Sequence, residues 1–221
     1  SGVADLDPGV GVSELTAMGS IDAFLLRLAA QDVTAPEATE ITPSTTGPTA
    51  KDAVSFEVQF SEAVTQFDDA SDLVITHSGT AHIGVEISGG PMGFTVVVSG
   101  ISGDGSFTLA ANLASDIEDG AGNALASSVT SAPVTIDNTA PFITITNNTD
   151  AFNLIDCNAA AYIDPGATAM DGTDGVVGVT ASGSVDTSVP ASYSITYTAT
   201  DVAGNEGSTT RIVTVLDNCG A

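Results

Sequence analysis

Short acidic motifs supply the clearest chemistry in this sequence. Residues 137–142 read Asp-Asn-Thr-Ala-Pro-Phe, residues 171–174 read Asp-Gly-Thr-Asp, and residues 201–205 read Asp-Val-Ala-Gly-Asn. Carboxylate and amide oxygens are the ligands that Ca²⁺ prefers, and it takes six to eight of them. Carboxylates that lie close together repel one another unless a cation neutralises them. The predicted calcium ligands of this set are Asp137, Asn138, Asp171, Asp174, Asp201 and Asn205.

A second, weaker set of the same residue types lies nearer the N-terminus. It comprises Asp32, Asp119 and Asn123, with Asp68 or Asp69 as further candidates. The alternative for each Asp-x-Ala-Gly-Asn motif is a plain turn, because Gly and Asn tolerate a positive φ and Asp caps a turn. Turn chemistry selects the same residues, so both interpretations stay open from the sequence alone.

The charge balance restricts the partners. The chain carries 20 Asp and 8 Glu against three basic residues, for a net charge of −25. Such a surface repels nucleic acid and anionic lipid and attracts divalent cations, although acidity can also serve only to solvate a protein in a saline habitat. The longest apolar runs are too short to span a membrane, so no membrane insertion is expected. The start at Ser1, without a recognisable signal peptide, favours a processed secreted chain or an excised fragment.

The elements that must position these motifs are β-strands. In residues 54–61 the apolar side chains alternate with polar ones, and residues 193–200 repeat that period of two. Gly, Asn, Asp, Ser and Pro interrupt such runs at short intervals. Many short strands with frequent turn residues are typical of a β-sandwich or barrel. The predicted fold class is therefore all-β.

An internal repeat divides the chain. Asp-x-Thr-Ala-Pro occurs at residues 32–36 and again at 137–141, and Asp-x-Ala-Gly-Asn occurs at 119–123 and again at 201–205. Each Asp-x-Ala-Gly-Asn precedes a last strand that ends in Asp-Asn. This layout predicts two tandem sandwiches, residues 34–138 and residues 139–221, preceded by a short N-terminal arm, residues 1–33.

Both predicted modules resemble Ig-like repeats of bacterial surface proteins. The first does so through residues 55–65, 98–105 and 119–125, and the second resembles another such family through residues 162–169, 171–175 and 193–205. The resemblance implies Ig-like sandwiches in an extracellular spacer or adhesive module. Residues 137–142 are similar to the calcium-binding linker of cadherins, although the other acidic motifs of that family are absent. The linker resemblance implies calcium where the modules meet.

The N-terminal arm has a different pattern. Residues 7–12 and 19–28 are similar to part of one blade of a bacterial surface β-propeller repeat. One partial blade cannot bury its own apolar face, so the arm needs a partner. It either folds back onto the first sandwich or pairs with the sheet edge of a neighbouring subunit.

Cysteine use and one tyrosine add structural expectations. Cys157 and Cys219 either pair in an oxidising compartment or stay as two buried thiols. A disulfide between them would close a loop of about 62 residues and stabilise the fold by about 4 kcal/mol in the chain-entropy description. Tyr193, three residues after Pro190, is either the corner tyrosine of a sandwich or a core aromatic.

The sequence contains no motif that indicates a catalytic site. His77 and His82 are the only histidines, and their spacing matches no metal-binding helix motif. The leading hypothesis is a non-enzymatic, calcium-stiffened structural or adhesive module of a bacterial surface protein, whose partners are adjacent modules or neighbouring subunits. The alternatives are a self-assembling subunit of a sheath, surface layer or filament, and a polysaccharide-binding appendage of a secreted enzyme. The absence of Trp argues against the last.

Overall fold

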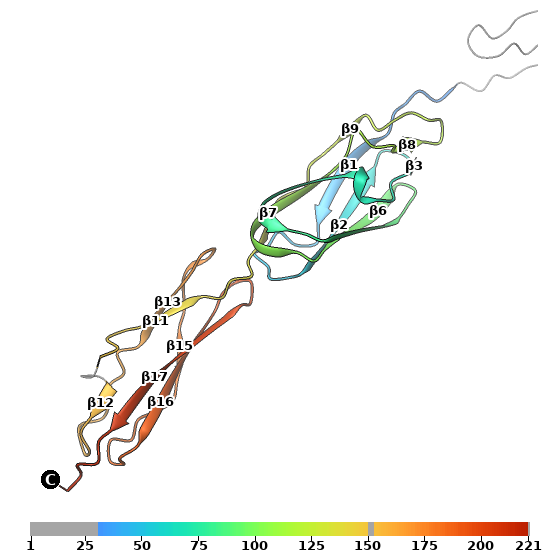
Figure 1. The fold of residues 1–221 in the computed structure, drawn as a ribbon. Coiled ribbons are helices and arrows are strands. Elements are labelled where there is room, and N and C mark those ends of the chain that lie inside the picture. Colours follow the sequence, from blue (N-terminus) through green and yellow to red (C-terminus); the bar gives the residue numbers. More distant parts are fainter. Residues whose placement is uncertain (1–30, 150–152, 221) are drawn as a thin grey trace, which may run out of the picture. The chain divides into compact units, whose positions relative to one another are not determined.

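The computed structural model describes residues 31–149 and 153–220, and β-strands make up most of their regular structure (Figure 1). Contacts between residues divide the chain into two compact units, Ser1–Val33 and Thr34–Ala221. The second unit carries all the strands given below. The propeller resemblance of the N-terminal arm rests on residues 7–12 and 19–28, which lie outside the described residues. Within the described part of the chain, no helix is long and apolar enough to cross a membrane.

The first sandwich, built from strands β1 to β10, has a five-stranded sheet and a three-stranded sheet (Figure 1). The larger sheet has the order β5-β6-β2-β1-β9, with β1 Glu37–Pro43, β2 Ala53–Phe60, β5 Gly84–Gly89, β6 Gly93–Ser99 and β9 Ser127–Ser128. The smaller has the order β10-β7-β4, with β4 Leu73–Ala81, β7 Ser102–Ala111 and β10 Val134–Ile136. A short pair joins β3 Val64–Thr65 to β8 Glu118–Asp119, and the 3-10 helix η1 spans Ala70–Asp72.

The core of the first sandwich follows from the alternation in the sequence. In β2, every second side chain from Val54 to Phe60 is buried, and the residues between are exposed or half-buried. Phe60, Phe67 and Phe94 meet edge to face with ring centroids 5.0–5.7 Å apart. Such aromatic contacts add to the free energy gained by burying apolar area. The period-two pattern thus correctly predicted which face of this strand is buried.

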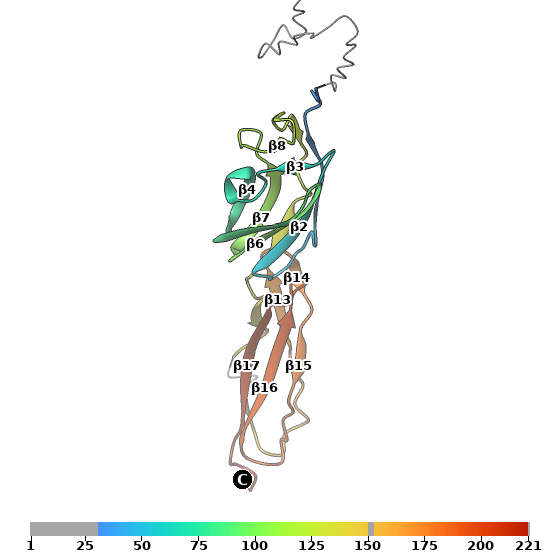
Figure 2. The same cartoon turned by 90° about the vertical axis from the view of Figure 1, so that its right-hand side faces the viewer.

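The second sandwich, built from strands β11 to β17, pairs a three-stranded sheet with a four-stranded one (Figure 2). The first has the order β11-β13-β14, with β11 Phe142–Ile145, β13 Ala167–Asp171 and β14 Gly175–Val177. The second has the order β12-β17-β16-β15, with β12 Leu154–Ile155, β15 Thr180–Ser182, β16 Ser192–Thr200 and β17 Glu206–Val215. Its own buried cluster includes Ile143, Ile195, Tyr197 and Val213. The all-β, Ig-like prediction is confirmed.

A buried arginine lies within this second core. Arg211 is 1% exposed, and its Nε lies 3.3 Å from Asp164 Oδ1. Nε donates to the Tyr197 hydroxyl at 3.1 Å, and the other guanidinium nitrogens donate to Asn153 and to the carbonyls of residues 146 and 147. Nearly every donor of the guanidinium therefore has an acceptor, which is the condition for holding a charge inside a sandwich.

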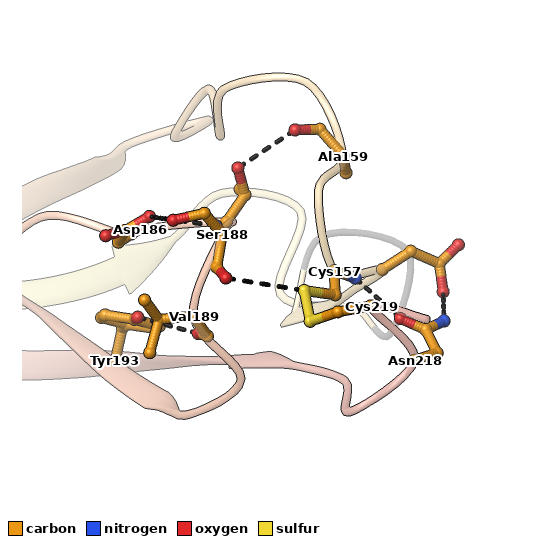
Figure 3. Close-up of a disulfide and its surroundings, with 10 residues drawn as sticks. Cys157, Ala159, Asp186, Ser188, Val189, Tyr193, Asn218 and Cys219 are labelled. Atoms are coloured by element: carbon orange, nitrogen blue, oxygen red, sulfur yellow. Dashed lines mark hydrogen bonds between the residues drawn. A yellow bond between two sulfur atoms is a disulfide. The ribbon is translucent and has the colours of Figure 1, made fainter. Parts of the chain in front are cut away.

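A disulfide closes the end of the second sandwich (Figure 3). Cys157 bonds to Cys219, so the paired state predicted for these cysteines is confirmed. The Asn218 side chain accepts from the Cys157 amide at 2.8 Å and donates to Asp156 Oδ1 at 2.7 Å. The Tyr193 hydroxyl donates to the carbonyl of Val189 at 2.9 Å, the backbone contact of a corner tyrosine (Figure 3).

Candidate metal centre at the linker

Three of the predicted ligands gather at the linker between the sandwiches. Each of Asp137, Asp171 and Asp174 offers a carboxylate oxygen, and these oxygens lie within 4.8 Å of one another. Asp137 follows β10, Asp171 ends β13, and Asp174 belongs to the turn between β13 and β14. Calcium–oxygen distances are about 2.3–2.6 Å, so two ligands on opposite sides of one ion lie about 5 Å apart. With this spacing, all three carboxylate oxygens could contact one ion.

Two carboxylates of the triad have unsatisfied oxygens in a buried setting. Asp137 is 1% exposed and Asp171 is 6% exposed. Asp137 Oδ2 and Asp171 Oδ2 are buried and have no hydrogen-bond partner among the described residues. A buried carboxylate oxygen without a partner carries a large desolvation penalty. A cation between these oxygens would remove that penalty.

The other oxygens of the triad fix the shape of the site. Asp171 Oδ1 accepts from the amides of Thr173 and Asp174, at 2.7 and 2.9 Å, and so closes the β13–β14 turn. Asp174 Oδ2 accepts from the Val202 amide at 2.7 Å, which ties this turn to the Asp-x-Ala-Gly-Asn hairpin. The backbone thus holds these two carboxylates in place before any ion binds.

Electrostatics at the triad favour a neutralising partner. Burial raises the pKa of Asp137 above its ordinary value, and the negative charges of Asp171 and Asp201 raise it further. Hydrogen bonds from the Thr139 amide and the Thr173 side chain act in the opposite direction and lower this pKa. A group of this kind binds either a proton or a metal ion more readily than an isolated carboxylate does.

Asp201 and Asn205 take part in a turn that also fastens the linker. Asp201 Oδ1 accepts from the amides of Gly204 and Asn205, and Oδ2 accepts from the Asn205 side chain. Gly204 has a φ of +98°, so it takes the backbone conformation that the turn needs. The Asn205 side chain also donates to the carbonyl of Asp137 at 3.0 Å. This motif is therefore a turn whose asparagine binds the incoming chain.

The first sandwich repeats this arrangement. Asp119 Oδ1 accepts from the amides of Ala121 and Asn123, and Oδ2 accepts from the Asn123 side chain. That side chain also donates to the carbonyl of Thr34. The turn alternative predicted a positive φ for both the glycine and the asparagine. In both copies the glycine takes that conformation, whereas the asparagine does not and instead donates through its side-chain amide.

The remaining predicted ligands make other contacts or belong to another part of the chain. The Asn138 side chain donates to the carbonyl of Gly103, and its amide donates to Asp104 Oδ1 at 2.7 Å. Asn138 thus fastens the linker to the first sandwich through its backbone and side-chain amides. Asp69 caps η1 through Ser71. Asp32 belongs to the unit Ser1–Val33.

The histidines form an aromatic contact. His77 and His82 lie edge to face with ring centroids 5.9 Å apart. Among residues 31–149 and 153–220, neither belongs to a group of three or more potential metal ligands.

Comparison with known proteins agrees with this fold. Residues 158–215, within the second sandwich, match the family described as bacterial surface protein, Ig-like domain. This part of the chain is thus similar to a domain of bacterial surface proteins, and together with the disulfide it fits an extracellular location. The search of curated proteins gave no match.

Two solved structures show weaker likeness. The adhesin InvE of Yersinia pseudotuberculosis is 11% identical with a TM-score of 0.32, over 80% of this chain and 58% of that one. The cis-dimer structure of protocadherin gammaB7 EC3-6 is 16% identical with a TM-score of 0.30, over 82% and 51%. The chain thus spans less than two thirds of the length of either of these chains.

Proposed function

We propose that this chain is a non-enzymatic structural or adhesive module of a bacterial surface protein, in which Ca²⁺ stiffens the link between two Ig-like sandwiches. The proposal that Ca²⁺ binds here rests on two buried oxygens without a hydrogen-bond partner, Asp137 Oδ2 and Asp171 Oδ2. The surface-module part is supported by the all-β fold, by the disulfide and by the family match of residues 158–215.

The ion would act by joining the linker to the second sandwich. Asp137 lies in the linker, whereas Asp171 and Asp174 flank the β13–β14 turn. Without a cation, three carboxylates within 4.8 Å repel one another and loosen this junction. With Ca²⁺ bound, the same groups attract a common centre, so the junction becomes more rigid. Contacts between domains of one chain are otherwise mobile by default.

Thermal melting with and without Ca²⁺ tests this proposal. Extracellular calcium modules reach dissociation constants of about 10⁻⁴ M. At 1 mM Ca²⁺ such a site adds about 1.4 kcal/mol, which raises the melting temperature of a domain of 60–100 residues by about 6–11 °C. In small-angle scattering, chelation is expected to broaden the distribution of distances within the particle.

The variant Asp171→Asn distinguishes a metal-binding site from an acidic cluster that is neutralised by a proton. Asparagine retains an oxygen that accepts from the Thr173 and Asp174 amides, but it removes one charge. The variant is expected to melt at or above the wild-type temperature in chelator and to lose the response to Ca²⁺. The matched control is Asp186→Asn, because Asp186 closes an exposed turn through Ser188 in the same sandwich. Wild-type protein that melts identically in Ca²⁺ and in chelator would falsify the calcium site.

A further inference from the structure

An exposed row of apolar side chains crosses the outer face of the sheet β11-β13-β14. Phe142 of β11 is paired with Met170 of β13, which is paired in turn with Val176 of β14. These three side chains are 60–80% exposed, as is Val202 in the neighbouring hairpin. We call Phe142, Met170, Val176 and Val202 the apolar row.

The row lines two adjoining hollows. One, of about 510 Å³, is lined by Phe142, Met170 and Val176 together with Ala169 and two threonines. The other, of about 330 Å³, includes Val176 and Val202. Val176 belongs to both, so the row is one continuous surface. Contiguous exposed apolar surface of this kind marks interaction sites more often than isolated apolar residues do.

The opposite sheet of the same sandwich provides an internal contrast. Its outer face carries cross-strand hydroxyl pairs, Ser192 with Thr214 at 3.3 Å and Thr196 with Thr210 at 3.4 Å. Hydroxyl groups are what a solvated strand face ordinarily presents. Between these two pairs Ile212, 51% exposed, lies opposite Ser194, so one isolated apolar side chain interrupts that face. On β11, β13 and β14, in contrast, Phe, Met and Val lie side by side across three paired strands.

The charge around the row selects the partner. Asp174 and Asp201 line the second hollow beside Val202. Arg211 is the only basic residue of the second sandwich and is buried, so this sandwich offers no cation to offset these carboxylates at its surface. Even with Ca²⁺ bound, three triad carboxylates outweigh its two positive charges. A second copy of this chain, with a net charge of −25, and an anionic membrane would both be repelled.

We propose that the apolar row is a docking surface for a basic, apolar protein segment, in which hydrophobic side chains alternate with Lys or Arg. The hydrophobic side chains would enter the two hollows, and the cations would face the carboxylates at their rim. Burial of apolar area supplies most of the affinity, and charge complementarity supplies selectivity and a faster association rate. This proposal does not depend on calcium.

Peptide titration of the full chain tests the surface. The probe is a fluorescein-labelled Lys-Phe-Lys-Leu-Lys peptide, measured by fluorescence anisotropy at 0.15 M salt in Ca²⁺ and in chelator. The comparison peptides are Lys-Ser-Lys-Ser-Lys, which keeps the charge, and Glu-Phe-Glu-Leu-Glu, which keeps the apolar side chains. We expect the first peptide to bind at least tenfold more tightly than either of the others under both conditions.

Variants locate the binding on the row. The double variant Phe142→Thr/Val176→Thr keeps β-forming residues at exposed positions and is expected to weaken binding at least tenfold. The control Ile163→Thr alters an exposed apolar residue of the same sandwich outside the row and is expected to bind as wild type does. Equal binding of the two lysine peptides, or no loss in the double variant, would overturn the proposal. A dimer in sedimentation that the double variant abolishes, or variant-sensitive binding to anionic vesicles, would overturn it in favour of a second copy or a membrane.

Discussion

Arg211→Met gives the sharpest test of how the second sandwich is held together. Methionine keeps the unbranched aliphatic stem, which stays packed among apolar side chains, but it removes the guanidinium. Asp164 then loses its counter-charge, and the Thr146 carbonyl and the Asn153 side chain lose the donors that reach them from Arg211. The variant thus leaves several polar groups unsatisfied with little change in volume.

The size of the effect follows from the burial of the two partners. Removal of one member of a buried ion pair destabilises a protein by about 3–5 kcal/mol. Arg211 is fully buried, but the Asp164 side chain is 23% exposed and water can reach it, so we expect the lower limit of about 3 kcal/mol. For a domain of 60–100 residues this corresponds to a fall of about 12–24 °C in melting temperature.

Tyrosine fluorescence reports this change selectively. All three tyrosines of the chain, at positions 162, 193 and 197, lie in the second sandwich, and the chain contains no tryptophan. Urea unfolding followed at the tyrosine emission therefore measures the second sandwich alone. Arg211→Lys serves as the control, since it keeps the charge but not the planar set of donors, and is expected to recover part of the loss. A loss below about 1 kcal/mol in Arg211→Met would refute the argument that this network is a main support of the core.

Three further outcomes are expected. Asn205→Ala removes the side-chain bonds to the linker and is expected to speed amide exchange there, with a loss of about 1–2 kcal/mol in the second sandwich. Reduction of the Cys157–Cys219 disulfide is expected to destabilise that sandwich by about 4 kcal/mol by the same tyrosine assay, and a free-thiol count of zero before reduction checks the starting state. Hydrogen bonds from the Thr139 hydroxyl and, to a lesser extent, from the Asn138 amide lower the pKa of Asp104. These bonds protect the linker amides from exchange at pH values above the ordinary Asp pKa of about 3.9. The protection is lost as the pH falls through the lower pKa of the folded state. Amide exchange in Asp104→Asn is expected to lack that pH dependence.

Much of the fold could be predicted because the alternation of side chains is local. The buried positions of β2 and β16 follow directly from the period of two in residues 54–60 and 193–199. The repeated Asp-x-Ala-Gly-Asn motif predicted a turn before each last strand, and both turns are present. Contacts within five residues are encoded by neighbouring residues, so they can be derived from one sequence.

Long-range partners could not be predicted in the same way. Arg211 binds the carbonyls of residues 146 and 147 and the side chain of Asn153, all more than 50 residues away, and its sequence neighbours give no sign of this network. The Asn138 side chain donates to the carbonyl of Gly103, 35 residues away, and its sequence neighbours give no sign of that contact either. The apolar row was missed because β14 has only three residues, too few to reveal a period of two.

The disulfide has a consequence for a chain pulled by its two ends. Because Cys157 and Cys219 are covalently joined, load passes across the sulfurs and bypasses the 61 residues between them, which include β13 to β17. Stretching can then unravel only the segment before Cys157, and about 200 Å of extended length stays locked within the loop. Single-molecule stretching with and without reductant would show this as a difference in contour length. Under oxidising conditions most of this sandwich therefore lies outside the path of mechanical force.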